Sequence, residues 1–319
     1  MTRVLVTAPI PQVALTILKA ANLEIETYDG PGLITKSELI DRIKGQDYLI
    51  TPLSTQVDRD VIDADPQLKL IANYGAGFNN IDTTYARTKG IPVTNTPGVS
   101  TTSTAEVTTG LIITLAHRMV EGDRLMHTTG FDGWAPLFFL GHELAGKTLG
   151  IVGMGSIGQA VAQRMHAFDM PIVYSQRHQL DAAVEQRLGA RFVSLDDLVA
   201  QSDVVTLHCP LTPETHHLLG AAQFQQMKSS AYLINAARGP IIDEAALLTA
   251  LQQHRLAGAA LDVYEAEPHV ADGFKQLDNV ILTPHVGNAT VEARDAMATI
   301  VAENVVRVNQ HQDPKFIIN

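Results

Sequence analysis

The chain has 319 residues, of which 45% are hydrophobic and 18% charged, a composition typical of a globular protein long enough for two domains. Its 23 Lys and Arg against 34 Asp and Glu give a formal net charge of −11. That balance argues against nucleic acid or an anionic membrane as the main partner, because both require a basic face. The single cysteine, Cys209, excludes an intrachain disulfide framework and a thiolate metal site.

No stretch approaches the roughly 18 uninterrupted apolar residues of a membrane helix. The N-terminal apolar run before Pro9 is also too short for the apolar core of a signal peptide. We therefore expect a cytoplasmic protein without a membrane segment.

Short β-branched runs alternate with helical periods in the first third of the chain. Strands are expected at 3–9, 23–29, 47–51, 68–75 and 91–98, and helices at about 11–20, 36–44, 58–64 and 81–88. The strands are nearly continuous apolar runs, which is typical of parallel strands covered on both faces. The alternation predicts an open, doubly wound α/β sheet.

A polar, threonine-rich bridge follows Gly98 and leads into a long helix predicted from about Ala105 to Met126. The alternation then restarts, with strands at about 148–152, 171–175, 191–193, 203–208, 231–235, 258–263 and 280–283, and a last helix at about 290–310. We expect two α/β domains, with the last helix crossing back to the first. The expected division is 1–98 with 287–319, and 99–286.

A glycine-rich turn lies near the middle of the chain, between a predicted strand and a predicted helix. In "GMGSIG", Gly153 allows a tight turn, Gly155 lets a pyrophosphate approach the backbone, and Gly158 lets helix and strand pack closely. The helix N-terminus offers free N–H groups to the phosphates. Because the strand and helix are the context that the motif requires, the turn predicts a dinucleotide site. Its contacts are expected from Gly153, Met154, Gly155, Ser156, Ile157 and Gly158.

The next predicted strand ends without the carboxylate that usually binds the ribose of NAD. An Asp or Glu about 20 residues after the turn binds the 2′-hydroxyl, whereas an arginine accommodates a 2′-phosphate. Here the strand ends in Ser175, Gln176, Arg177 and His178, and Asp181 comes too late to serve. The pattern favours NADP(H), and NAD(H) remains the alternative. A solvated surface charge is the other interpretation of Arg177.

Three later strands end in ionisable residues. Arg238 follows "YLINAA", Asp262 and Glu267 follow "AAL", and His285 follows "NVILTP". In an open parallel sheet, ligands bind outside the carboxyl ends of the strands. An arginine, an acid and a histidine can therefore converge beside the nucleotide. Taken singly, each also has a structural interpretation: a surface ion pair, a loop residue, or a packed histidine.

These three residue types suit one reaction. A guanidinium can bind a carboxylate with two parallel hydrogen bonds and polarise a neighbouring carbonyl. A histidine can donate a proton to an oxygen that gains negative charge. A carboxylate on the other ring nitrogen orients that imidazole and favours its charged form. With a nicotinamide, the set predicts hydride transfer to a 2-keto acid.

The stretches "LGIVGMGSIG", "NAARGPIIDE", "ALDVYEAEP" and "TPHVGNAT" resemble, in order and spacing, the signature segments of the D-isomer-specific 2-hydroxy acid dehydrogenase family. "NYGAGFNNID" and "TPGVSTTSTAE" extend the likeness over essentially the whole chain. The resemblance implies an α/β fold in which a Rossmann-type nucleotide-binding domain is inserted in a flavodoxin-like substrate domain. The missing acid after the second nucleotide strand departs from the family pattern and puts a preference for NAD in doubt.

The resemblance also implies residue roles. Arg238 would bind the substrate carboxylate and carbonyl, His285 would be the acid/base, and Glu267 would be its partner. Asp262 would lie near the nicotinamide, and the backbone of Gly75, Ala76 and Gly77 would meet the substrate carboxylate. The remaining residues expected at the cofactor are Cys209, Pro210, Ala236 and Gly287.

Within that family, "WAPLFFLGHELAGKTLG" is similar to the glyoxylate and hydroxypyruvate reductases. In some of them this tryptophan reaches a neighbouring subunit's active site, so Trp134 is a candidate for the substrate site of a homodimer. A plain interface residue is an equal alternative. Leu53 and Ser54 are candidates for the pocket wall, and no cation stands beside them in "TPLSTQVD". A phosphorylated substrate would want one, so a small or moderately apolar 2-keto acid fits better.

Two further interpretations concern metals and function class. His208, His216 and His217 gather near Cys209, but their spacing matches no common zinc pattern, so no metal is expected. The alternative function is a nucleotide-sensing, corepressor-like binding protein on the same fold, which would show extra segments or an eroded catalytic set. Formate or phosphite oxidation would show other residues at the acid position or long extensions.

Overall fold

The computed structural model describes residues 2–319 and shows two compact units. The first unit comprises residues 1–100 and 289–319, and the second comprises 101–288. Each boundary lies two residues beyond the expected one. Both units are built on parallel sheets, which confirms the predicted α/β fold class.

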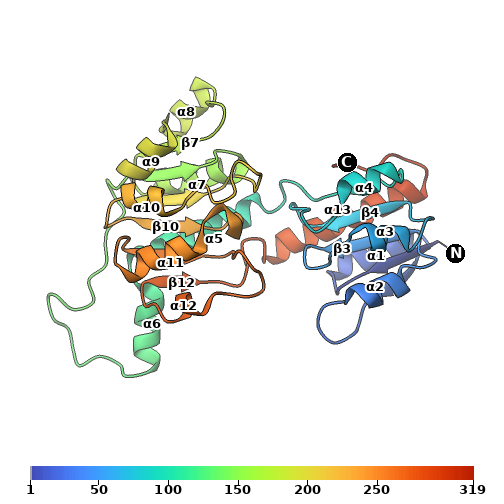
Figure 1. The fold of residues 1–319 in the computed structure, drawn as a ribbon, viewed down its shortest axis with the longest axis horizontal. Coiled ribbons are helices and arrows are strands. Elements are labelled where there is room, and N and C mark those ends of the chain that lie inside the picture. The colour runs from blue at the N-terminus through green and yellow to red at the C-terminus, as the bar shows by residue number, and fades with distance from the viewer. Residues whose placement is uncertain (1) are drawn as a thin grey trace. The chain divides into compact units, whose positions relative to one another are not determined.

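The first unit holds a five-stranded parallel sheet in the order β2-β1-β3-β4-β5. That order is the flavodoxin-like one. Helices α1 and α13 lie together against the face that carries Val4, Ile50 and Ala72 (Figure 1). The elements of this unit are β1 Arg3–Val6, α1 Gln12–Ala20, β2 Glu24–Thr27, α2 Lys36–Arg42, β3 Tyr48–Pro52, α3 Arg59–Asp63, β4 Leu70–Tyr74, α4 Thr83–Thr88, β5 Val93–Thr94 and α13 Val291–Asn309.

The second unit holds a seven-stranded parallel sheet in the order β12-β11-β10-β9-β6-β7-β8. Counted along this unit, the order reads 3-2-1-4-5-6 with one strand added, which is the Rossmann arrangement. Its strands are β6 Leu149–Val152, β7 Ile172–Ser175, β8 Ala190–Phe192, β9 Val204–Leu207, β10 Tyr232–Asn235, β11 Gly258–Leu261 and β12 Val280–Leu282. Its helices are α5 Thr101–Ala116, α6 Met119–His127, α7 Ser156–His166, α8 Ala182–Leu188, α9 Leu195–Gln201, α10 Ala221–Gln226, η1 Gly239–Ile241, α11 Glu244–Gln252 and α12 Asp272–Lys275.

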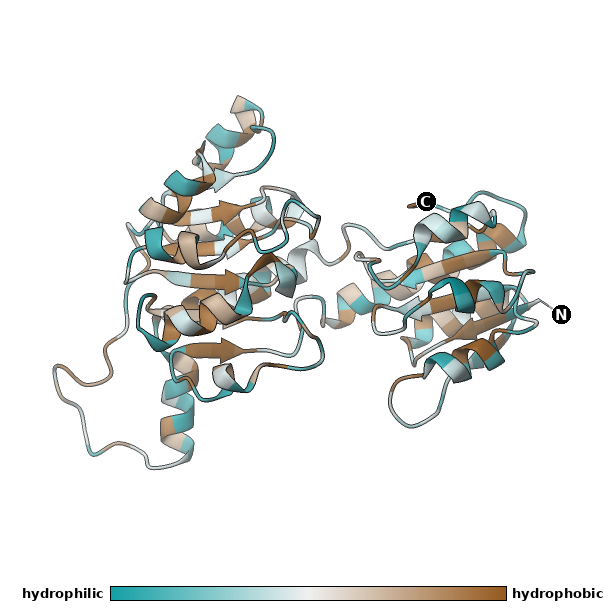
Figure 2. Cartoon of the chain, viewed as in Figure 1, coloured by the Kyte–Doolittle hydropathy of each residue, from teal (hydrophilic) through white to brown (hydrophobic). Residues whose placement is uncertain are grey.

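The strands lie at the centre of the hydrophobic cores of both units. Figure 2 shows the strands of both sheets mostly as hydrophobic residues, whereas hydrophobic and hydrophilic residues alternate along the helices beside them. In the second unit, Val205 and Leu207 face one core while Val204 faces the other, on the α5 and α7 side. Burial on both faces explains why these strands read as continuous apolar runs.

The predicted helix from Ala105 to Met126 is wrong in two respects. It begins earlier, at Thr101, because Ser103, Thr104 and Thr108 turn toward the protein and are buried there. It also breaks after Ala116, where Arg118 takes a left-handed φ of 56°. The chain returns at this break, and His142 N donates to the Ala116 carbonyl at 2.8 Å. A tertiary hydrogen bond therefore ends the helix where the sequence pattern continues.

The predicted strand at 91–98 is also too long. Only Val93 and Thr94 pair with β4, between Pro92 and the later Pro97. Proline lacks the N–H that a ladder requires and fixes φ, so this segment forms a short edge strand. The polar residues that follow, from Asn95 on, leave the sheet.

Candidate active site

The three glycines of the turn after β6 meet different surroundings. Gly153 has a φ of 93°, and a Cβ there would stand 2.6 Å from the Cys209 backbone nitrogen. A Cβ on Gly158 would stand 2.2 Å from the Gly153 carbonyl oxygen. Gly155, by contrast, has no atom within 4 Å of where a Cβ would lie. The chain's own packing therefore requires Gly153 and Gly158, whereas the space over Gly155 is left open for a bound group.

The first turn of α7 is free to bind an anion. No side chain caps this helix, and among residues 2–319 no acceptor is present for the backbone N–H groups of Ser156 and Ile157. Ser156 is exposed and Ile157 partly so. Free N–H groups at the start of an 11-residue helix, beside an open glycine, fit the pyrophosphate of a dinucleotide.

The end of β7 carries an amide where a carboxylate is usual. Gln176 Oε1 accepts a hydrogen bond from the Met154 backbone N–H at 2.9 Å, and its Nε2 donates to the His178 carbonyl at 2.6 Å. The neutral side chain thus ties the glycine turn to the loop after β7. A neutral group at this place puts no negative charge against a ribose 2′-phosphate.

Arg177, next in the loop, is exposed, and in the described part of the chain no hydrogen bond or ion pair engages its guanidinium. The carboxylate of Glu214, from the segment after β9, is near enough for Arg177 to help lower its pKa, after larger contributions from hydrogen bonds with Thr212 and its own backbone. The arginine is therefore a free cation at the edge of the turn. Sequence spacing gave no sign of Glu214.

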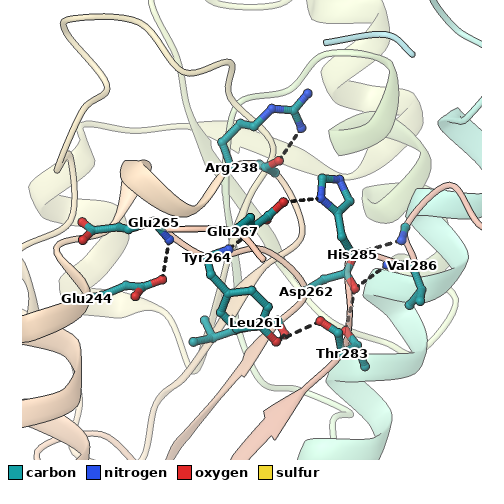
Figure 3. A network of polar contacts seen from close by, with 12 residues as sticks. Arg238, Glu244, Leu261, Asp262, Tyr264, Glu265, Glu267, Thr283, His285 and Val286 are labelled. Carbon is teal, nitrogen blue, oxygen red and sulfur yellow. Dashed lines mark hydrogen bonds and ion pairs between the residues drawn. The ribbon is translucent and has the colours of Figure 1, made fainter. Parts of the chain in front are cut away.

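The predicted catalytic residues come together at the carboxyl ends of adjacent strands. Arg238 follows β10, Glu267 follows β11, and His285 follows β12. Figure 3 shows the three side chains approaching from separate loops. His285 Nδ1 and Glu267 Oε2 are 2.8 Å apart, and both side chains are about one-third exposed. The geometry leaves His285 Nε2 as the ring nitrogen not held by Glu267.

The electrostatics of this group follow from its burial and its charges. Burial raises the pKa of Glu267, but the hydrogen bond and charge of His285, the Tyr264 N–H and the charge of Arg238 outweigh it and bring the pKa below its ordinary value. Burial lowers the pKa of Arg238, against the smaller effect of Glu267. An arginine remains protonated after such a shift. The carboxylate and the guanidinium are thus both charged at neutral pH.

Arg238 is held by its own loop and keeps most of its donors free. Its Nη1 donates to the Ala237 carbonyl at 2.7 Å. In residues 2–319 no carboxylate forms an ion pair with this guanidinium, although Glu267 contributes to its electrostatic surroundings. A partly buried guanidinium with unused donors is suited to a planar anion such as a carboxylate.

Asp262 fixes the segment that carries His285. The carboxylate is 1% exposed and accepts from the Thr283 hydroxyl at 2.6 Å and from the backbone N–H groups of Val286 and Gly287, both at 2.8 Å (Figure 3). His285 itself has a left-handed φ of 54°, a conformation that costs free energy in a residue with a side chain. The clamp by Asp262 offsets that cost and sets the direction of the imidazole.

The loop that carries Glu267 is anchored from two sides. A Cβ on Gly239 would stand 1.9 Å from the Tyr264 carbonyl carbon, so the loop after Arg238 and the loop before Glu267 touch at backbone distance. Tyr264 N donates to Glu267 Oε1 at 3.0 Å, and Glu265 N donates to Glu244 Oε1 at 2.7 Å (Figure 3). His217 Nε2 lies 2.5 Å from Glu265 Oε1. These contacts hold Glu267 in place.

The other residues predicted at the cofactor also lie in the second unit. Cys209 and Pro210 follow β9, with the Cys209 backbone against Gly153; Ala236 follows β10, and Gly287 packs against Asp262. Burial raises the pKa of the Cys209 thiol to about 11, so it is an unreactive neutral group. Burial lowers the pKa of His208 to about 3, and its Nε2 lies 3.0 Å from the Thr206 hydroxyl.

The residues predicted at the substrate from the first part of the chain lie in the first unit. Leu53 and Ser54 follow β3, and Gly75, Ala76 and Gly77 follow β4, so both segments stand at the carboxyl edge of that sheet. Trp134 lies in the segment after α6 and is 83% exposed. Across residues 2–319, no group of three His, Cys, Asp or Glu side chains is arranged to hold a metal ion.

Comparison with known proteins identifies the family. Residues 109–287 match the model of the "D-isomer specific 2-hydroxyacid dehydrogenase, NAD binding domain". The chain is 52% identical over its full length, and over the full length of its relative, to a Staphylococcus haemolyticus protein named as a 2-hydroxyacid dehydrogenase. The chain belongs to the D-isomer-specific 2-hydroxyacid dehydrogenase family. It is therefore an oxidoreductase of that family, and the recognition made from sequence motifs is confirmed.

Solved structures resemble this family member along its whole length. A protein from Thermus thermophilus is 41% identical with a TM-score of 0.94, and each chain is covered completely. An NADPH-dependent glyoxylate/hydroxypyruvate reductase from Sinorhizobium meliloti, in complex with citrate, is 29% identical with a TM-score of 0.86, covering 100% of this chain and 98% of that one. Within residues 2–319, no helix is both long enough and apolar enough to span a membrane.

The structure adds residues to the site of this dehydrogenase that sequence reasoning missed. Thr104, near the start of α5, donates to the Gly287 carbonyl at 3.0 Å and lies against the Asp262–Gly287 contact. Glu244 supports the Glu267 loop from α11. Both stood in quoted motifs, "TTSTAE" and "PIIDE". The spacing of these motifs did not predict a role for either residue, because their hydrogen-bond partners lie far away in the sequence.

Proposed function

We propose that this family member reduces a small 2-keto acid, such as glyoxylate or hydroxypyruvate, to the D-2-hydroxy acid, with NADPH preferred over NADH. The observation that carries the proposal is the meeting of Arg238, Glu267 and His285 at adjacent strand ends, in the same unit as the open glycine turn. Hydride transfer to a keto acid needs an anion binder, a proton donor and a dinucleotide, and this unit offers a residue set for each.

The catalytic roles follow from the hydrogen bonds. Arg238, with its free donors, binds the substrate carboxylate and polarises the keto oxygen. His285 donates a proton from Nε2 to that oxygen as it gains negative charge. Glu267 holds Nδ1, which fixes the ring orientation and stabilises the imidazolium. The glycine turn and the start of α7 would hold a reduced nicotinamide dinucleotide, which would supply the hydride when bound.

Support for NADPH comes from the loop after β7. Gln176 is neutral where a carboxylate would repel a phosphate, and Arg177 is an exposed cation without an ion-pair partner in the described chain. The pyrophosphate would lie over Gly155, against the first N–H groups of α7. The reductase from Sinorhizobium meliloti is named as NADPH-dependent, which agrees with this assignment.

The substrate class rests on charge. In the first unit, the loop that holds Leu53 and Ser54 offers no lysine or arginine between Thr51 and Asp58. A second anionic group on the substrate would lack a partner there. We therefore assign Leu53 and Ser54 to the wall for a short, uncharged side chain, and the backbone of Gly75, Ala76 and Gly77 to the substrate carboxylate.

We further propose a homodimer. The segment after α6 leaves the sheet of the second unit and carries exposed apolar side chains, among them Phe131, Trp134 and Leu137 (Figure 1). These side chains are 51%, 83% and 84% exposed in the single chain. Neighbouring apolar side chains with such exposure are typical of a surface that binds another protein molecule. A second copy of the chain is the proposed cover, and Trp134 is the candidate to reach the partner's site. Sedimentation equilibrium of wild type and Trp134→Ala tests this.

The deciding experiment is a matrix of steady-state rates. Glyoxylate, hydroxypyruvate, pyruvate and phenylpyruvate are each tested with NADPH and NADH. We expect kcat/KM to favour NADPH and the smaller acids. Arg177→Ala should raise KM for NADPH about 10-fold or more and leave KM for NADH within about 2-fold, because only the 2′-phosphate loses a charged partner. A tenfold preference of the wild type for NADH would contradict the cofactor assignment, and no reduction of any keto acid would contradict the function.

A further inference from the structure

In the loop after β4 of the first unit, the backbone carbonyls are hydrogen-bonded within the protein, whereas most of the backbone N–H groups are not. From Gly75 to Phe78, every carbonyl oxygen accepts a hydrogen bond from the protein: Gly75 from Thr96 N, Ala76 and Gly77 from side chains, and Phe78 from Ile81 N. The N–H groups of Ala76, Gly77 and Phe78 have no acceptor within residues 2–319. Ala76 and Phe78 are exposed and Gly77 is partly so. Successive free N–H groups of this kind form a concave site for an anion.

Two buried amides create that imbalance. Asn73, 0% exposed, donates through Nδ2 to the Gly75 carbonyl at 3.0 Å and to the Gly77 carbonyl at 2.7 Å. Asn95, 8% exposed, donates through Nδ2 to the Ala76 carbonyl at 2.7 Å. Because carbonyl oxygens only accept, these contacts fix the nitrogen of each amide toward the loop. Asn73 lies in β4 and Asn95 directly follows β5. The side chains that hold the loop therefore come from two neighbouring strands of the sheet.

We propose that Asn73 and Asn95 are positioning residues for the substrate carboxylate: by binding the three carbonyls inward, they turn the N–H groups of Ala76, Gly77 and Phe78 outward as a carboxylate site. This rests on the proposed function, in which this loop binds the substrate carboxylate. A peptide plane carries its N–H and C=O on opposite sides, so a carbonyl held inward directs its following N–H outward. The amides are neutral, so they fix this geometry without placing a charge under the anion.

The test replaces each amide by a group of the same size that cannot donate. In Asn73→Asp and Asn95→Asp, an oxygen faces the loop carbonyls, and the repulsion releases them. We expect KM for the keto acid to rise about 10- to 100-fold, the cost of losing hydrogen bonds to a charged group. The inhibition constant of oxalate, a carboxylate competitor, should rise in parallel. Saturating kcat should change less than about 3-fold, and the dissociation constant of NADPH should not change.

Asn304→Asp is the matched control. Asn304 is 1% exposed in the same unit, and its Nδ2 donates to the Lys315 carbonyl at 3.0 Å, away from the loop. Asn304→Asp should lower the melting temperature without raising KM for the keto acid or weakening inhibition by oxalate. Should either loop variant fail to fold, Asn95→Ser, which keeps a shorter donor, gives a smaller rise in KM by the same route.

The proposal is overturned if both aspartate variants keep wild-type KM and oxalate inhibition, or if Asn304→Asp raises KM equally. A fall in kcat at unchanged KM also overturns it. Failure of the proposed function looks different, since the wild type itself would then reduce no 2-keto acid.

Discussion

Each unit carries polar side chains at the carboxyl edge of its parallel sheet, but these side chains are neutral in the first unit and ionisable in the second. At the carboxyl edge of the first unit, the neutral side chains of Asn73, Asn95 and Thr51 donate hydrogen bonds to backbone carbonyls. At the corresponding edge of the second unit, Arg238, Glu267 and His285 are ionisable. The first arrangement can fix the position of an anion, whereas the second can also exchange a proton with it.

This difference predicts a division of kinetic effects. Changes to the neutral network should act on KM, because they alter how a carboxylate is held. Changes to the charged group should act on turnover and on its dependence on pH, because they alter stabilisation of the charge that develops in the transition state. Three variants of the second unit sharpen that contrast.

The largest effect is expected for His285→Ala. Removing the proposed proton donor should lower kcat by about two to four orders of magnitude, the usual range for a lost general acid. Binding of NADPH, followed by its fluorescence, should stay within about 2-fold, since the glycine turn is untouched. A fall in kcat of less than about 10-fold would show that another group donates the proton, and the roles given to Glu267 and His285 would then be wrong.

Glu267→Gln should have an intermediate effect. The amide keeps the shape of the side chain but removes the charge beside His285 Nδ1, so kcat near pH 7 should fall about 10-fold. In the wild type the lowered pKa of Glu267 keeps this carboxylate ionised, and its contribution to stability is lost only as pH falls through that lowered value.

Glu265→Gln is the control for this change, because it removes the same charge two positions away, where the partner is His217. An equal fall of kcat in the two variants would mean that general negative charge, and not the hydrogen bond to His285, supports turnover.

The smallest effect is expected for Glu244→Gln. Burial raises the pKa of Glu244. The hydrogen bond from the Glu265 N–H lowers it by less, and the negative charges of Glu265 and Glu267 raise it further. A raised pKa contributes stability at acid pH that is lost as pH rises through the raised value. The glutamine keeps the acceptor for Glu265 N without the charge, so its melting temperature should exceed that of the wild type by about 2 °C near pH 7. The two should converge near pH 4, where the ordinary glutamate is half protonated.

Turnover of Glu244→Gln should stay within about 3-fold, since the Glu267 loop keeps its anchor. Glu303→Gln, at an exposed position of α13, should show no such change with pH. A melting temperature of Glu244→Gln that is lower than that of the wild type at pH 7 would show that the charge itself stabilises this loop.

Local patterns predicted much of the fold and part of the site. The apolar strand runs and the glycine turn depend on neighbouring residues, so their positions were correct to within a few residues, except where prolines shortened the strand at 91–98 or a contact from elsewhere intervened. The break at Arg118 is such a case, because it depends on His142 returning to the Ala116 carbonyl. The same holds for Glu214 near Arg177 and for Thr104 beside Gly287, whose partners are far along the chain.

The sequence alone determined which residue types stand at the strand ends, because strand–helix alternation places those ends on one edge of a parallel sheet. It therefore determined the fold class, the family and the candidates Arg238, Glu267 and His285. The tertiary structure decided which atoms meet: Nδ1 and not Nε2 on Glu267, Gln176 on the glycine turn, and the loop carbonyls on Asn73 and Asn95. Hydrogen bonds extend only about 3 Å, so such pairings depend on packing that no spacing in the sequence specifies.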